Sequence, residues 1–283
     1  MRTKFLAFAA TALMLASCSN DEVLTPQDDL KDTPITIASA GVAELTTRVI
    51  TEGYLIGSMD EPVSISVWVE GSAEKYNADN VEWVHNGECW IAKSQTLFEG
   101  TNSKQKICAL SPYVNGASAE GVTITADGVT DYLVASQTLI TSNPVNICMS
   151  HALAKLVLNP TLGTEVTGDN IATVKVQNMY TQGTLNVKVN NWTNCTGTTA
   201  FTMTNNEVLV VPMEGCESFP IVITMESGRT FSANISLANL GNKLEGGTQY
   251  TINLQIGHDT VTIGDISAAS WGTPVVGGDL ETE

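Results

Sequence analysis

The chain has 283 residues, 43% of them hydrophobic and 15% charged, and its formal net charge is −17. This length fits one large or two medium domains, and the hydrophobic fraction is that of a globular chain with a core, which excludes a disordered tail. The excess of acidic residues argues against nucleic acid as a partner, because its phosphates would be repelled.

Residues 1–17 are typical of an export signal. Arg2 and Lys4 precede an uncharged, mostly apolar stretch from Phe5 to Leu15, and two small residues follow it. A helix of that stretch would span about half of a hydrocarbon core, so it is too short to stay in the membrane. We therefore expect this segment to be removed as a signal peptide.

Cys18 follows the signal directly, and Leu15-Ala16-Ser17-Cys18 resembles the lipobox of bacterial lipoproteins. The resemblance implies cleavage before Cys18 and acylation of its sulfur and its new amine, and lasting membrane attachment requires two or more acyl chains. Ser19 to Glu22 resembles the acidic tag that sends some lipoproteins of anaerobic Gram-negative bacteria to the outer face of the outer membrane. An ordinary secretory signal with an incidental cysteine is the alternative. Without Arg2 and Lys4 the mature chain would hold 11 basic and 30 acidic residues, a net charge of −19.

Residues 18–33 predict a flexible acidic tether, because they are rich in aspartate and lack hydrophobic periodicity. Order is expected from Pro34, where Ile35 and Ile37 would point to one face of a short strand. The alternation stops in the polar segment that ends at Arg48.

Five later segments alternate apolar and polar residues as half-buried strands do. They are residues 62–70, 184–190, 220–226, 230–237 and 249–256. Turn-forming residues lie between them and no long amphipathic helix is evident, so we expect an all-β fold of packed antiparallel sheets. Strand patterns on both sides of His151 predict two tandem antiparallel β-sandwich domains, residues 34–150 and 151–283. The stretch 143–160 is ambiguous between a helical turn and a strand.

The cysteines after Cys18 indicate neither a zinc site nor a disulfide framework, because they are widely spaced and contain no C-x-x-C pair. Buried free thiols are favoured over one or two bridges, whose partners the sequence does not identify. These cysteines are Cys89, Cys108, Cys148, Cys195 and Cys216.

No sequence motif for catalysis, a cofactor or a metal site occurs, and we expect a protein that is not an enzyme. The three histidines lie far apart, and His151 is expected to be packed and hydrogen bonded. Asp127 and Asp131 would suit an acid–base pair or a calcium site, but beside Gly128 they are first of all turn formers.

Trp83 and Trp90 flank Asn86-Gly87, a strong hairpin signal, so they should extend from two adjacent strands. Together they could form a stacking platform for a glycan. As core or edge aromatics they would need no ligand, and we favour that interpretation.

Several fragments, in this order along the chain, resemble the fimbrillin family, the Mfa-like and FimA-like subunits of type V pili. They are "TTR" at 46–48, "VEWVHNGECW" at 81–90, "ICALSPYV" at 107–114, "DYLVA" at 131–135, "SHALAKLVL" at 150–158, "EVLVVP" at 207–212 and "GGTQYTINLQI" leading to "ISAASWG" within 246–272. The likeness covers nearly the whole mature chain. It departs from the family pattern where "ICALSPYV" lacks an aromatic residue before its alanine, and in the short tail after Trp271.

The resemblance implies two β-sandwich domains of fimbrillin type, export as a lipoprotein to the outer membrane and cell surface, and assembly with other fimbrial subunits. Assembly would proceed by strand exchange after a protease cuts behind an arginine, and Arg48, followed by Val49, matches that site. If Ile35 and Ile37 pack a first strand into a sheet, the cut would free this strand and leave unpaired backbone groups for a strand of another subunit.

Our first hypothesis is therefore a structural or adhesive subunit of a surface fimbria, with host or bacterial surface ligands as further partners. The rival is a surface glycan-binding lipoprotein of β-sandwich type that uses Trp83 and Trp90. Thr260, between Asp259 and Val261, also resembles an acceptor of O-glycosylation in these bacteria. The tail Gly272–Glu283 lacks alternating apolar residues and should be a poor donor strand, as in a tip or accessory subunit.

Overall fold

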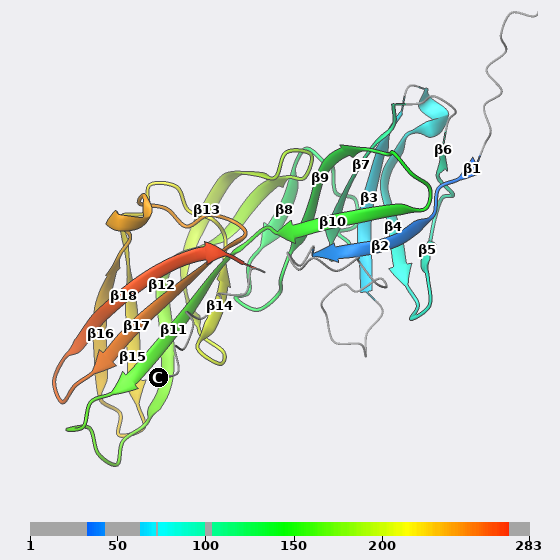
Figure 1. Cartoon of the computed structure of the whole chain (residues 1–283). Coiled ribbons are helices and arrows are strands. Elements are labelled where there is room, and N and C mark those ends of the chain that lie inside the picture. The colour runs from blue at the N-terminus through cyan, green and yellow to red at the C-terminus, as the bar shows by residue number, and fades with distance from the viewer. Residues whose placement is uncertain (1–32, 43–62, 72, 100–103, 272–283) are drawn as a thin grey trace, which may run out of the picture.

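The fold is built almost entirely from β-strands (Figure 1). The structure, a computed structural model, describes residues 33–42, 63–71, 73–99 and 104–271. Within these ranges the helices are two short 3-10 turns, Glu74–Tyr76 and Ala238–Leu240, and neither is long and apolar enough to cross a membrane. The all-β prediction is confirmed.

Seven strands from the first part of the described chain form one sheet. They are β2 (Ile37–Val42), β3 (Val63–Glu70), β4 (Ala78–His85), β5 (Trp90–Ala92), β7 (Lys106–Ser111), β9 (Leu133–Leu139) and β10 (Val145–His151). Their order in the sheet is β2-β10-β9-β7-β3-β4-β5, and β1 (Thr33–Pro34) pairs separately with β6 (Phe98–Glu99). Ile37 and Trp90, from the two edge strands, belong to one buried cluster with Trp83 of β4, so the sheet curves around its own core.

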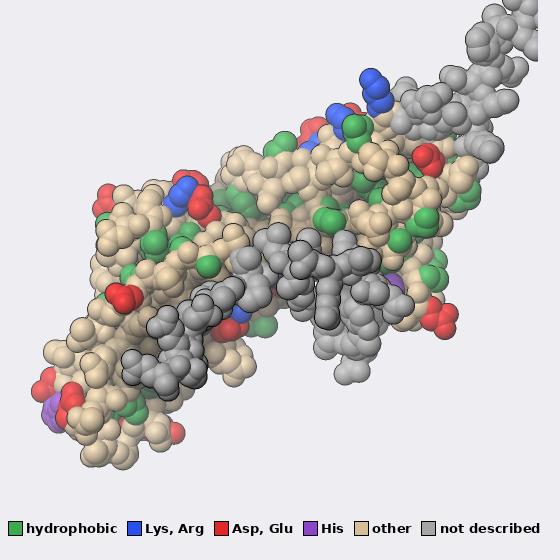
Figure 2. All heavy atoms as spheres, in the orientation of Figure 1, with side chains coloured by type: hydrophobic (Ala, Val, Ile, Leu, Met, Phe, Trp, Pro, Cys, Tyr) green, Lys and Arg blue, Asp and Glu red, His purple; other side chains and the backbone are tan. Residues whose placement is uncertain are grey.

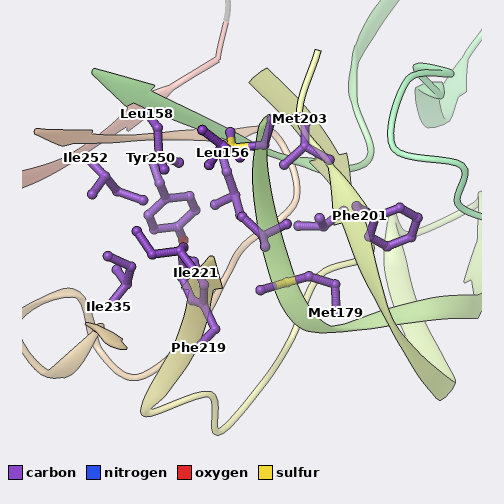
Figure 3. Close-up of a cluster of buried hydrophobic side chains, with 14 of the residues drawn as sticks. Leu156, Leu158, Met179, Phe201, Met203, Phe219, Ile221, Ile235, Tyr250 and Ile252 are labelled. Atoms are coloured by element: carbon purple, nitrogen blue, oxygen red, sulfur yellow. The ribbon is translucent and has the colours of Figure 1, made fainter. Parts of the chain in front are cut away.

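Two further sheets pack face to face in the rest of the described chain. One contains β11 (Ala154–Leu162), β14 (Glu207–Val210), β17 (Thr248–Ile256) and β18 (Val261–Ser270), in the order β14-β11-β17-β18. The other contains β12 (Ile171–Asn186), β13 (Asn191–Thr202), β15 (Ser218–Met225) and β16 (Thr230–Ser236) in the order β13-β12-β15-β16, and β8 (Val122–Thr125) also pairs with β12. Tyr250 and Leu156 of the first sheet point toward Ile221 and Met179 of the second in a shared core (Figure 3).

A third buried cluster joins these parts of the molecule. It contains Trp68 and Leu110 of the seven-stranded sheet, Ile124 of β8 and Leu185 of β12. Apart from β8, the strands before and after His151 belong to different sheets. Because β8 lies before the predicted boundary but pairs with a strand behind it, the domain limits stay a prediction.

Two strand pairs are parallel within sheets that are otherwise antiparallel, as the sequence pattern predicts. β2 runs parallel to β10, and β11 runs parallel to β17. Parallel neighbours need a long connection, and several other strands intervene between the members of each pair. Alternation identifies the buried face of a strand but not its neighbour, which is why the sequence did not predict these two parallel pairs. The ambiguous stretch 143–160 is strand, in β10 and β11.

Hydrophobic side chains on the face shown in Figure 2 are scattered among polar ones, and acidic side chains occur along the length of the described chain. Among the described side chains this face presents no single large apolar patch of the kind that marks a protein interface. Unpaired backbone groups at the edge of a sheet are another feature that can bind a second chain.

Candidate functional site

The segment 33–42 lies along one outer edge of the seven-stranded sheet. β2 and β10, blue and green in Figure 1, run side by side in the same direction. β2 ends the strand order of its sheet, so β10 is its one ladder partner among the described strands. Removal of the segment would therefore break the pair of β2 with β10 and the short pair of β1 with β6, and it would leave the other pairs of the seven-stranded sheet in place.

Apolar side chains seat this segment in the core. Ile35 and Ile37 are only 2% and 6% exposed, and both belong to the buried cluster of the seven-stranded sheet. Thr36 and Ala38 are exposed, whereas Ala40 is buried again. The predicted alternation of the first strand is thus confirmed at its start.

Backbone hydrogen bonds hold the segment from two sides. Val145 N–H donates to Thr36 O at 2.7 Å, and Ile35 N–H donates to Leu97 O at 2.8 Å. The parallel pairing with β10 continues to Val42, which lies opposite Met149. The segment is thus held by β10 of the seven-stranded sheet along residues 36–42 and by the chain around β6 at its start.

We call the outer side of residues 143–149, which the segment covers, the β10 edge. Without segment 33–42, this edge would present unpaired backbone N–H and C=O groups beside an open apolar surface. Such an edge binds another extended strand, with backbone hydrogen bonds for strength and alternate side chains for register. The arrangement can therefore exchange one strand for another.

Three predicted site residues, Cys18, Arg48 and Val49, lie outside the described residues, as do the signal peptide 1–17 and the tail Gly272–Glu283. Their roles stay predictions. Among the residues that the structure does describe, no group of three or more His, Cys, Asp or Glu side chains could hold a metal ion.

Trp83 and Trp90 lie on β4 and β5, which form the expected antiparallel hairpin. Their exposed fractions are 4% and 6%, because both indoles point into the core of the seven-stranded sheet. Trp90 also packs edge-on against His85, with ring centroids 5.2 Å apart. Neither ring presents a face on which a sugar could stack, so the two tryptophans are core aromatics and not a platform.

His151 is packed and hydrogen bonded, as the sequence predicts. Its Nδ1 lies 2.7 Å from Oδ2 of Asp131, and its ring stacks on Trp271 with centroids 3.5 Å apart. Lys155 Nζ lies 5.5 Å from the centroid of the same indole and pairs with Glu207 at 2.7 Å. These contacts hold Trp271, which directly follows β18, against His151 at the end of β10.

Asp127 and Asp131 have different roles. Asp127 forms the predicted turn, in which its Oδ1 accepts the backbone N–H groups of Val129 and Thr130 at 2.8 and 2.7 Å, and Gly128 has a φ of 87°. Burial raises the pKa of Asp127, but these bonds and one from the Thr130 hydroxyl outweigh it, and the pKa is lowered. Asp131 instead pairs with His151, which is 20 residues away in sequence and which the local sequence does not identify as its partner.

The five described cysteines are free thiols. Cys108 and Cys216 are buried as expected, and burial raises the pKa of the Cys108 thiol to about 12. Cys89 and Cys148 are exposed, so the expectation of buried thiols was wrong for these two. Cys148 falls on the outward face of β10, between two buried neighbours.

Thr260 lies in the exposed turn between β17 and β18, and its glycosylation stays a prediction.

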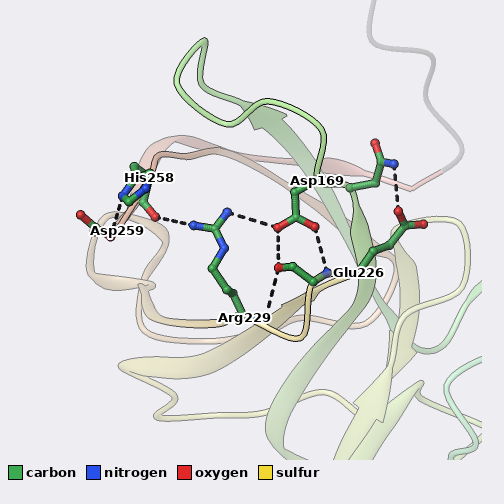
Figure 4. Close-up of polar contacts among 7 residues, drawn as sticks. Asp169, Glu226, Arg229, His258 and Asp259 are labelled. Carbon is green, nitrogen blue, oxygen red and sulfur yellow. Dashed lines mark hydrogen bonds and ion pairs between the residues drawn. The ribbon is translucent and has the colours of Figure 1, made fainter.

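A polar network that the sequence did not predict reaches the same turn (Figure 4). In this network Arg229 pairs with Oδ2 of Asp169 at 3.2 Å and donates a hydrogen bond to His258 O at 2.9 Å. Ser227 donates to the same carboxylate from its N–H and its hydroxyl, and with Arg229 it lowers the pKa of Asp169. The network ties three turns together.

One comparison with known proteins identifies a family. A model described as fimbrillin-like matches residues 47–271 of this chain. No curated protein sequence matches it.

Solved structures share the fold. A "putative cell adhesion protein" from Bacteroides uniformis has a TM-score of 0.64 at 19% identity, over 84% of this chain and 99% of that chain. A second protein so described, from Bacteroides ovatus, has a TM-score of 0.61 at 17% identity, over 86% of this chain and 98% of that chain. A fimbrial protein from Bacteroides vulgatus has a TM-score of 0.50 at 11% identity, over 73% and 92% of the two chains. At these identities the likeness is one of fold.

Proposed function

Since this chain belongs to the fimbrillin-like family, we propose that it is a structural or adhesive subunit of a cell-surface type V fimbria. In this proposal it reaches the outer membrane as a lipoprotein anchored through Cys18. It then assembles with other fimbrial subunits by strand exchange after cleavage behind Arg48. Membership in a family of fimbrial proteins also supports a role other than catalysis.

The observation that carries the proposal is the position of segment 33–42. The segment precedes the predicted cut behind Arg48, lies at the edge of its sheet, and buries Ile35 and Ile37 in the core. A cut there would turn a covalently held strand into a separate peptide. A strand from another subunit could then occupy the β10 edge, and apart from the pair of β2 with β10 the released segment gives up only the two-residue pair of β1 with β6 among the described strands.

We further propose that this subunit accepts a strand but donates one weakly, as a tip or accessory subunit would. The tail Gly272–Glu283 is long enough, since extended residues advance about 3.3 Å each. Its apolar residues are the adjacent Val275 and Val276 and the distant Leu280, which do not alternate, and Pro274 lacks an N–H. Such a tail would fill a groove poorly.

The rival function, glycan binding by a surface lipoprotein, depended on Trp83 and Trp90 as stacking surfaces. Burial of both indoles removes the side chains that supported it. Host or bacterial surface ligands remain partners of the proposed fimbrial subunit, because an adhesive subunit needs a target.

The test is to purify surface fibres from the producing bacterium and to sequence the N-terminus of this chain within them. The expected N-terminus is Val49, and the Arg48→Ala chain should not enter fibres. Lys31→Ala, which removes a basic residue from the acidic tether, is the matched control and should be processed normally. A fibre-bound chain that begins at Cys18 would contradict strand exchange, and a chain absent from fibres that binds glycan arrays would favour the rival function.

A further inference from the structure

Two asparagine side chains of the β10 edge contact the first strand directly. Oδ1 of Asn143 accepts hydrogen bonds from the N–H of Thr36 at 3.0 Å and from its hydroxyl at 3.1 Å, and Nδ2 donates to Pro34 O at 2.8 Å. Oδ1 of Asn146 accepts a hydrogen bond from the Ser39 hydroxyl at 2.7 Å. Both the backbone and the side chains of the bound segment are therefore in contact with these amides.

The Asn143 amide continues the strand ladder beyond the end of β10. β10 begins at Val145, whose N–H donates to Thr36 O at 2.7 Å. On the same side of the segment, the Asn143 side chain then accepts a hydrogen bond from Thr36 N–H and donates one to Pro34 O, whereas Ile35 N–H between them turns the other way to Leu97 O. A side-chain amide can do this because it carries the same C=O and N–H groups as a peptide.

A β-bulge brings the second hydroxyl to the same side of the sheet. Ile37 lies opposite Val145 and Ser39 lies opposite Asn146, so Ala38 is an extra residue in the segment. In a regular strand Ser39 would point to the same face as Ile37. The bulge turns its hydroxyl toward Asn146, which is exposed, while Ser39 itself is buried, with an exposed fraction of 7%.

We infer that Asn143 and Asn146 select which strand the β10 edge accepts. The favoured partner is a segment of another subunit with one hydroxyl residue between two branched aliphatic residues and a second hydroxyl residue three positions later. The aliphatic side chains fill the apolar groove, and the hydroxyls fix the register, since a shift by one residue would place aliphatic groups against the amides. This inference rests on the proposed function, because it assumes that the incoming strand replaces segment 33–42.

The tail of this chain, Gly272–Glu283, does not have this pattern of aliphatic and hydroxyl residues. Thr273 is followed by Pro274, and Thr282 lies between two glutamates, so neither hydroxyl has branched aliphatic neighbours. Two copies of the chain should therefore not join well through this tail, in agreement with weak donation.

The test uses the Cys18→Ser chain with a site-specific protease site inserted behind Arg48. After cleavage, labelled peptides with the sequence of residues 33–42 compete with the released segment, and fluorescence anisotropy measures their affinities at equilibrium. A Thr36→Val peptide loses the hydroxyl but keeps its shape, and it should bind about fivefold more weakly, whereas Thr36→Ser should bind within about twofold. Thr33→Val changes an exposed threonine and is the matched control, with a change below about twofold.

The decisive comparison is with the Asn143→Ala chain. Loss of the amide should weaken every peptide about tenfold, and the difference between the unsubstituted and Thr36→Val peptides should fall below about twofold. A fivefold difference that persists in Asn143→Ala overturns the inference and leaves strand exchange intact. Failure of every peptide to displace the segment overturns both. If Asn143→Ala does not fold, the peptide series on the unsubstituted chain decides, and equal binding of Thr36→Val and Thr36→Ser overturns the inference.

Discussion

Truncation of Ile35 should loosen the first strand from a chain that has been cut behind Arg48. Ile35 is 2% exposed, and Ile35→Ala removes three buried carbon atoms, each worth about 0.8 kcal/mol, and leaves a cavity. Such changes cost roughly 2–5 kcal/mol, and because an edge segment can shift to fill part of the cavity we expect about 2–3 kcal/mol. At about 1.4 kcal/mol per factor of ten, the dissociation constant of the segment should rise roughly 30- to 150-fold.

The assay cuts the Cys18→Ser chain at a site-specific protease site behind Arg48 and measures how much of the segment stays bound on dilution. Val189→Ala is the matched control, because it truncates an aliphatic side chain that is 65% exposed. It should change retention by less than about twofold. Equal retention by Ile35→Ala and the unsubstituted chain would refute the reasoning, because the segment would then be held by something other than its buried side chains.

Four further outcomes are expected. Cys18→Ser should abolish metabolic labelling with a fatty acid and leave the fold intact, and persistent labelling would contradict the lipid anchor. Arg48→Ala should block maturation, so that the cell-surface chain keeps its N-terminal segment, and a chain that still loses it would point to another cleavage site. At about pH 8 an alkylating reagent should modify exposed Cys89 well before Cys108, because burial raises the pKa of the Cys108 thiol to about 12 and keeps it protonated. Equal rates in the folded chain would contradict that burial. The cut chain should stay monomeric or form short oligomers, and long fibres that vanish on deletion of Gly272–Glu283 would show that the tail is a working donor.

The buried face of a strand can be predicted from sequence because it depends on local alternation. Ile35 and Ile37 are buried as expected, and so are Tyr250, Ile252 and Leu254 along β17. Alternation applied to β10 would likewise have placed Cys148 on the outward face, where the structure has it. The strand character of that stretch was ambiguous only because short apolar runs suit helices and strands alike.

Strand neighbours and long-range polar partners were not predictable, because they depend on which elements meet in three dimensions. No local feature of β2 indicates a parallel partner, and Arg229 and Asp169 are 60 residues apart in sequence. The glycan platform failed for a related reason. The hairpin signal identifies the two strands that carry Trp83 and Trp90. It does not tell which face of the hairpin is turned toward the core, and both indoles lie on that face.

The cut behind Arg48 matters on the proposed mechanism even though it changes no contact of segment 33–42. While the chain still connects this segment to β3, a competing strand must displace a tethered ligand whose effective concentration is in the millimolar range. A partner strand at about 1 μM would then need an affinity about a thousandfold higher, roughly 4 kcal/mol, to take its place. After the cut the released segment can dilute away, so a strand of equal affinity suffices. Until then the segment keeps the β10 edge covered, which prevents unpaired backbone groups from joining the wrong strand during export. Proteolysis would thus decide when the edge becomes available, and its two asparagines would decide which strand it accepts.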